Sequence, residues 1–149
     1  MYDNLFGELE YNYGWYGNTT ISFSGKETDI KIYIKSENET ETITDEQREA
    51  YQNFISSFSD IQGNISYKIY EYYKKIFSSL DDDIVEKGMS KNIREFLDTI
   101  KIYMIVVGYQ IQKHEISILF ECDWDEENGV GVLMYGTKIE NIGYISDVL

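Results

Sequence analysis

The chain has 149 residues, with 13 Lys and Arg side chains against 27 Asp and Glu, which gives a formal net charge of -14. This charge disfavours nucleic acid and anionic membranes as partners, and the apolar run Met104 to Val107 is far too short to span a bilayer. The length suits one domain, so we expect residues 1–149 to form a single domain. One cysteine, Cys122, and the lack of a signal-peptide pattern predict a cytoplasmic protein.

The N-terminal part of the chain alternates between apolar and polar residues, which is typical of half-buried strands. Alternation over 5–13 predicts a first strand, and the glycines within 14–18 predict a turn. Two further alternating stretches, 19–24 and 30–35, are separated by a short turn. These patterns together predict a three-stranded antiparallel meander.

A long amphipathic helix is predicted over about 44–80, because apolar residues recur there every three or four positions. Thr44 and Gln47 have the spacing of a capping box, which marks the start of the helix. Gly63-Asn64 predicts a kink, with a full break as the alternative, because glycine costs about 1 kcal/mol in a helix interior. The apolar stripe consists of Tyr51, Phe54, Phe58, Ile61, Ile65, Ile69, Tyr72, Ile76 and Leu80.

The C-terminal half is predicted to be mostly strand. After an acidic linker and a helical turn or two within 92–99, the β-branched run 100–107 predicts a central strand covered on both faces. The stretches 116–124 and 129–135 predict two more strands, and Gly136-Thr137 predicts a two-residue hairpin turn before a last strand over 138–145. The predicted fold class is α+β, a largely antiparallel sheet of about seven strands packed on the long helix.

The densest group of polar residues lies in the predicted hairpin after Phe120. A calcium loop would need a glycine in place of Asn128 and a bidentate glutamate in place of Met134, so we expect no metal here. Two interpretations stay open: a solvated turn, or an acidic surface for a basic partner. The candidate residues are Glu121, Asp123, Asp125, Glu126 and Glu127.

Aromatic residues form a second candidate contact site, because Tyr13, Trp15 and Tyr16 stand around the predicted first turn. Large flat rings lose little conformational entropy on binding, so this corner suits a partner side chain or a sugar. A strand end with a tight turn explains these residues equally well. The helix also carries a small basic and aromatic face, formed by Tyr67, Tyr70, Tyr73, Lys68, Lys74 and Lys75.

No pattern of catalytic residues is found in the sequence. His114 is the single histidine and stands in a polar turn, with no serine or cysteine nucleophile motif beside it. Cys122 falls on the apolar side of its predicted strand, which indicates a buried, unreactive thiol. We therefore expect no catalytic residue and no cofactor.

The C-terminal run 120–132, which reads FECDWDEENGVGV, resembles the end of an uncharacterised bacterial domain family whose motif is roughly W-D-x-E-H-G-hydrophobic-G. Asn128 stands at the position of the usual histidine, which argues against a metal or acid–base role for this corner. Small members of such families are often encoded beside secreted or contact-dependent toxins. The resemblance therefore implies an immunity protein that neutralises a toxin.

The leading hypothesis is a non-enzymatic immunity protein that binds and occludes a cognate toxin, such as a nuclease with a basic active site. The negative charge suits this role, because complementary fields accelerate association. One alternative is a phage or mobile-element inhibitor that acts as an acidic mimic of nucleic acid. The other is a small enzyme or ligand-binding domain that uses the aromatic corner or the acidic hairpin. The expected partner is a basic protein; nucleic acid and membranes are not expected partners, and the oligomeric state is not predicted.

Overall fold

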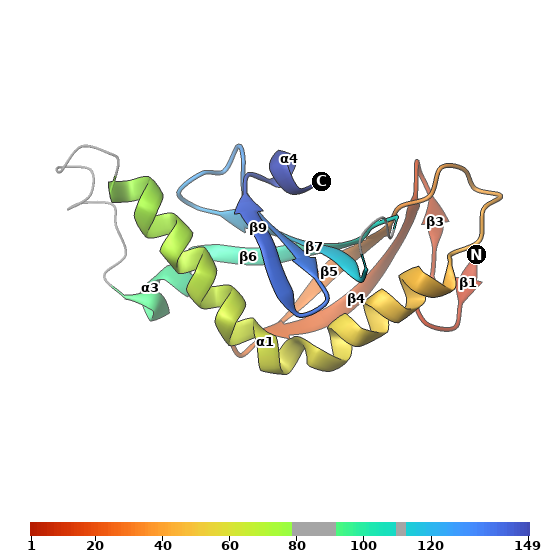
Figure 1. Ribbon diagram of the computed structural model, residues 1–149, viewed down its shortest axis with the longest axis horizontal. Helices are drawn as coiled ribbons and strands as arrows, with labels where there is room; N and C mark the ends of the chain where they lie inside the picture. Colours follow the sequence, from red (N-terminus) through yellow and green to blue (C-terminus); the bar gives the residue numbers. More distant parts are fainter. Residues whose placement is uncertain (79–91, 110–112) are drawn as a thin grey trace.

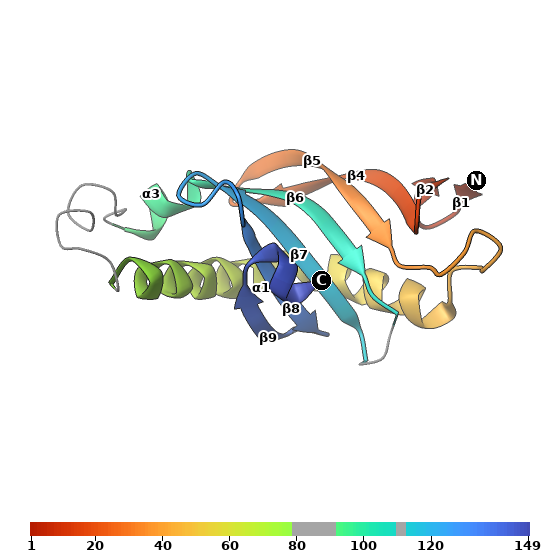
Figure 2. The same cartoon turned by 90° about the horizontal axis from the view of Figure 1, so that it is seen from above.

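The computed structural model describes residues 1–78, 92–109 and 113–149. The elements in chain order are β1 (Tyr2–Asp3), β2 (Gly7–Glu8), β3 (Glu10–Tyr11), β4 (Trp15–Phe23), β5 (Lys26–Ile34), α1 (Asp45–Ser78), α3 (Ile93–Leu97), β6 (Ile100–Val107), β7 (Glu115–Cys122), β8 (Val130–Tyr135), β9 (Lys138–Gly143) and α4 (Ile145–Val148). Strands β3 to β9 form one seven-stranded sheet in sequence order, and α1 runs across one face of it (Figure 1, Figure 2). The predicted α+β class is confirmed.

All neighbouring strands of this sheet are antiparallel except β5 and β6, which are parallel. A parallel pair needs a long crossover connection, and α1 lies within the chain between these two strands. Strand β6 is the fourth of the seven, so the run 100–107 is central as predicted. The remaining connections within the sheet are hairpins, including the predicted two-residue turn Gly136-Thr137 between β8 and β9.

The N-terminus of α1 is fixed by the predicted capping box. The Thr44 hydroxyl accepts the Gln47 N–H at 3.1 Å, and the Gln47 Oε1 accepts the Thr44 N–H at 3.1 Å. Gln47 does more than cap, because its Nε2 donates to the carbonyls of Lys35 at 2.8 Å and Gly108 at 3.0 Å. These residues directly follow β5 and β6, so one side chain attaches the helix to the ends of both parallel strands.

Helix α1 is 34 residues long and is not broken at Gly63. Figure 1 shows a bend near its middle, with the concave side toward the sheet. A bend of this sense lets a long helix follow a curved core. The predicted stripe is buried at Tyr51, Phe54, Phe58, Ile65 and Ile69, while toward the end of the helix Tyr73 is buried instead of Tyr72. Leu80 and the acidic linker after it lie outside the described residues.

The predicted strand over 5–13 is wrong. Strands β1 and β2 form a separate two-stranded sheet, β3 has only two residues, and Phe6 and Leu9 are both buried. The reason is a long-range contact: the Asp3 carboxylate accepts the N–H groups of Leu5 and Phe6 and forms a two-bond ion pair with Arg48 of α1. These bonds turn the chain and hold it against the helix.

The predicted turn over 14–18 is also wrong, because Trp15 already belongs to β4. Tyr11 pairs with Trp15, which places the turn at 12–14, and there Tyr13 and Gly14 have positive φ angles of 59° and 156°. A Cβ on Gly14 would lie 2.0 Å from the ring of Tyr33, so the close passage of that ring requires glycine. The periodicity of the sequence does not show that the Tyr33 ring lies next to Gly14.

The face of the sheet opposite α1 is partly covered by α4, a helix that the sequence did not predict. The predicted last strand over 138–145 ends at Gly143, and α4 packs Val148 against Val106 and Leu119. The Ser117 hydroxyl donates to the Val148 carbonyl at 3.1 Å. This cover buries Val106 and Leu119. Lys101 is exposed and Tyr103 and Met104 are only partly buried, so the prediction that 100–107 is covered on both faces holds only for part of the strand.

Candidate functional site

The acidic turn between β7 and β8 is shaped by Asp125. Its carboxylate accepts bonds from the Asn128 N–H at 3.2 Å and from the Asn128 Nδ2 at 3.1 Å, and its carbonyl accepts the Gly129 N–H at 3.0 Å. The Cys122 thiol also donates to the Asp125 carbonyl, at 3.3 Å. Asp125 is therefore occupied within the turn, and its role there is to hold the backbone in place.

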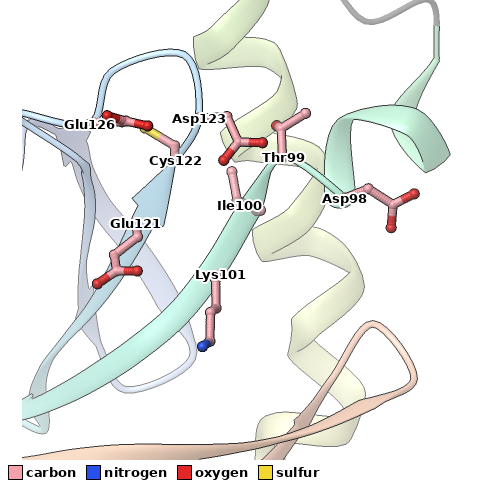
Figure 3. A pocket seen from close by; sticks show the side chains of 8 residues that line it. All are labelled: Asp98, Thr99, Ile100, Lys101, Glu121, Cys122, Asp123 and Glu126. Carbon is pink, nitrogen blue, oxygen red and sulfur yellow. The ribbon is translucent and has the colours of Figure 1, made fainter.

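Three of the predicted acidic residues, Glu121, Asp123 and Glu126, line a groove of about 480 Å³ at the end of β7 (Figure 3). The groove continues onto the start of β6, where Lys101 stands opposite Glu121 on the neighbouring strand. The Asp123 N–H donates to the Thr99 carbonyl at 2.9 Å, which joins the two walls. The other lining residues are Asp98, Thr99, Ile100 and Cys122, so Glu127 lies outside the groove.

Asp98 is a residue of this groove that sequence reasoning missed. It follows α3, and its carboxylate pairs with Lys26 of the β4–β5 hairpin at 3.1 Å. The predicted strands could have shown that Asp98 lies near the acidic turn, because the start of β6 and the end of β7 must meet if these two strands are antiparallel neighbours. The register Ile100 to Cys122 then places Asp98 at the same end of the sheet as Asp123.

The groove combines four carboxylates, those of Asp98, Glu121, Asp123 and Glu126, with the single lysine Lys101. Asp98 is paired with Lys26, whereas Glu121, Asp123 and Glu126 are exposed and can orient toward a cation that approaches the groove. Among the described residues no group of His, Cys, Asp and Glu side chains has an arrangement suited to a metal ion. The groove thus suits a positively charged side chain.

The predicted aromatic corner does not form one contact surface. Trp15 is buried at 7% exposure against Tyr11, with ring centroids 5.1 Å apart. Tyr16 stacks on Tyr33 at 4.6 Å, and the Tyr33 hydroxyl donates to the Tyr13 carbonyl at 2.9 Å. Only the Tyr13 side chain projects into solvent, with 87% exposure.

The structure also separates the two candidate sites from each other. The acidic groove lies beside α3, whereas the aromatic corner lies near β3, at the opposite end of the long axis (Figure 1).

The basic and aromatic face predicted on α1 is divided in a similar way. Tyr73 is buried against Phe96 and Trp124, with centroids 4.7 and 5.1 Å away, while the Lys74 ammonium lies outside, 4.7 Å from the Tyr70 ring centroid.

Cys122 is the only thiol of the chain, and it is buried at 3% exposure as the sequence predicted. Burial raises the pKa of this thiol to about 11, because the thiolate would lose its hydration. The protonated thiol is a poor nucleophile. Cys122 is therefore a buried, unreactive residue that lines the groove.

Comparison with known proteins identifies the family of the chain. A family model described as a domain of unknown function, DUF6985, matches residues 5–149. The chain belongs to this family. No curated protein and no solved structure matches it. In this DUF6985 domain, no helix within the described residues has both the length and the apolarity needed to cross a membrane.

The glycines of the C-terminal run in this DUF6985 domain are explained by packing against α4. Gly129 has a positive φ of 59°, and the Ile145 N–H donates to the carbonyl of the preceding Asn128 at 3.1 Å. A Cβ on Gly131 would lie only 2.1 Å from a methyl carbon of Val148. The turn and glycine residues of this run thus anchor the C-terminal helix.

Proposed function

We propose that this protein is a non-enzymatic immunity protein whose acidic groove binds a basic side chain of a cognate toxin. The observation that carries the proposal is the gathering of Asp98, Glu121, Asp123 and Glu126 around one groove. An arginine or lysine of the partner would enter the groove and meet these carboxylates. The toxin is proposed from the resemblance of the C-terminal run to domains encoded beside toxins.

The overall charge supports a basic partner. A net charge of -14 attracts a positively charged protein and accelerates the encounter at low salt. A nuclease toxin meets this description, because its active site must hold an anionic nucleic acid. Such a toxin acts on nucleic acid inside the cell, so we place the complex in the cytoplasm.

The rigidity of the acidic turn also supports the proposal. Asp125 and Asn128 hold the turn through several hydrogen bonds, and the Asp123 backbone is attached to Thr99. Carboxylates on a turn that is already ordered lose less conformational entropy on binding than those on a loose loop. The carboxylates of the groove are therefore preorganised to bind a cation.

The test is a triple variant, Glu121→Gln, Asp123→Asn and Glu126→Gln, assayed against the toxin encoded next to the gene. Asp125 is left intact because its loss would disturb the turn. We expect slower association, a shallower dependence of the association rate on salt, and weaker protection of cells that carry the toxin.

A matched control, Glu37→Gln, Glu39→Gln and Glu46→Gln, changes the net charge equally at exposed positions in the segment after β5 and in the first turn of α1. This segment lies at the opposite end of the long axis from α3 (Figure 1). We expect this control to affect association much less than the groove variant does. If both triple variants reduce the rate equally, only net charge matters and the groove is not the binding site. If neither changes protection, association rate or salt dependence, the proposal is wrong.

A further inference from the structure

A second cavity, of about 580 Å³, lies between α1 and the ends of two hairpins. Figure 1 shows the turn between β8 and β9 reaching toward α1. The Gly136 N–H donates to the His114 carbonyl at 3.0 Å, which holds the two hairpin ends together. The described residues that line the cavity are Asn53 and Ser57 of α1, Lys113 and His114 between β6 and β7, and Tyr135, Gly136 and Thr137 at the β8–β9 turn.

The chemistry of this lining is unlike that of the rest of the chain. The whole sequence has 27 acidic and 13 basic residues, yet the described lining contains one lysine and the single histidine and no carboxylate. Its remaining polar side chains, those of Asn53, Ser57, Tyr135 and Thr137, can all donate hydrogen bonds. These hydrogen-bond donors and the Lys113 ammonium together form an environment suited to a negatively charged group.

One carboxylate of the protein already approaches this cavity from its rim. The Glu49 Oε1 lies 3.6 Å from the His114 Nε2, and the Glu49 side chain is 63% exposed. This separation is longer than a hydrogen bond, and an exposed glutamate can rotate away without losing a buried contact. The Asn53 amide nitrogen lies 3.4 Å from both ring nitrogens of His114. Glu115, next in the chain, directs its carboxylate against Gly108 and does not line the cavity.

We propose that this cavity binds a small oxyanion, a phosphate or carboxylate group. The oxyanion takes the place of the Glu49 carboxylate beside His114 and is also reached by Lys113 and by the hydroxyls of Ser57 and Thr137. The backbone supports this arrangement, because His114 has a positive φ of 56° and the bond to Gly136 fixes its position. Residues held in sparsely populated backbone regions are concentrated at functional sites.

This site is independent of the proposed immunity function. The acidic groove lies at the start of β6 and the end of β7, whereas the cavity lies at the other end of the same strand pair. Failure of one proposal therefore leaves the other unaffected. The ligand is either a phosphorylated molecule or a carboxylate-bearing one, and separate titrations distinguish these sources.

The experiment is a pair of NMR titrations of the full chain, one with inorganic phosphate and one with acetate, at constant ionic strength maintained with chloride. The signals to follow are the His114 ring and the amides of Gly136 and Thr137. The variants are Lys113→Gln, His114→Asn, Glu49→Gln and the control Glu46→Gln; asparagine is chosen at 114 because it tolerates positive φ.

We expect saturable, localised shifts with a dissociation constant of about 1–10 mM for the preferred anion. Lys113→Gln and His114→Asn should each weaken binding about five-fold, and Glu49→Gln should strengthen it about two- to five-fold because it removes the internal competitor. Glu46→Gln removes the same charge from an exposed position of α1 and should change binding less than two-fold. Tighter binding of phosphate identifies a phosphorylated ligand, and tighter binding of acetate identifies a carboxylate.

Two results would overturn the proposal. The first is an absence of saturable shifts at these residues with both anions. The second is equal strengthening by Glu49→Gln and Glu46→Gln, because the effect would then come from net charge and not from the carboxylate beside His114. Lys113 is exposed, so its variant leaves the fold intact and keeps the test decisive if His114→Asn is unstable.

Discussion

Replacing Gln47 by glutamate tests how the helix is attached to the sheet. Glutamate fits a capping box as well as glutamine does, so local helix chemistry alone predicts a neutral change. In the structure, however, the Gln47 Nε2 donates to two carbonyls at 2.8 and 3.0 Å, and the residue is only 4% exposed. A carboxylate in this position would lose both donors and direct negative charge at the carbonyl oxygens of Lys35 and Gly108.

The loss of stability can be estimated from these contacts. The new side chain can avoid the charge by binding a proton, which from a pKa of about 4.3 costs at most about 3.7 kcal/mol at pH 7. A protonated glutamate still donates one hydrogen bond, so one bond is lost, worth about 1 kcal/mol. We therefore expect Gln47→Glu to lower the free energy of unfolding by about 3–5 kcal/mol at pH 7.

The pH dependence separates this explanation from a packing defect. Burial raises the pKa of the introduced carboxyl in the folded state, so its penalty is present at neutral pH and disappears as the pH falls below its unfolded value. Urea unfolding at pH 7 and near pH 4 should show the gap to wild type shrinking to about 1 kcal/mol. The control Gln52→Glu makes the same chemical change at an exposed position of α1 and should stay within about 0.5 kcal/mol. A Gln47→Glu variant as stable as this control at pH 7 would refute the reasoning.

Three further predictions concern stability. Asp3 has a pKa lowered to about 2 by its hydrogen bond from Arg48, so its stabilisation is complete above the unfolded value of 3.8 and is lost as the pH falls toward 2. Asp3→Asn should therefore cost about 1–2 kcal/mol at pH 7 and less than about 0.5 kcal/mol near pH 2, and equal losses at both pH values would contradict the ion pair. Gly131→Ala should destabilise by about 1–3 kcal/mol because its methyl group meets Val148 at 2.1 Å, and Val148→Ala in the same chain should recover part of that loss in thermal unfolding. Ile69→Ala should lower the free energy of unfolding by about 2–5 kcal/mol because Ile69 has 0% exposure, and a change below about 0.5 kcal/mol would show that this helix face is not in the core.

Local patterns in the sequence determined most of the helix and several strands. The capping box of Thr44 and Gln47 acts over three residues, and the stripe through Phe58 and Ile69 repeats with the period of one helical turn. The strands predicted over 100–107, 116–124 and 129–135 follow from alternation and from β-branched composition, because both depend on neighbours close in the chain. The structure ends the second of them at Cys122, two residues earlier than predicted. The acidic residues of the β7–β8 turn were also evident from the sequence alone.

Contacts between distant residues were decided only by the tertiary structure. The N-terminal alternation failed because Asp3 binds Arg48 from another element, and Trp15 is buried although its glycine-rich surroundings indicated a turn. Asp98 joins the acidic groove only through the pairing of β6 with β7, and His114 meets Asn53 only where a hairpin end reaches α1. Periodicity reports the face on which a side chain lies, but the energy of each such contact depends on a partner up to 72 residues away, and local sequence does not identify that partner.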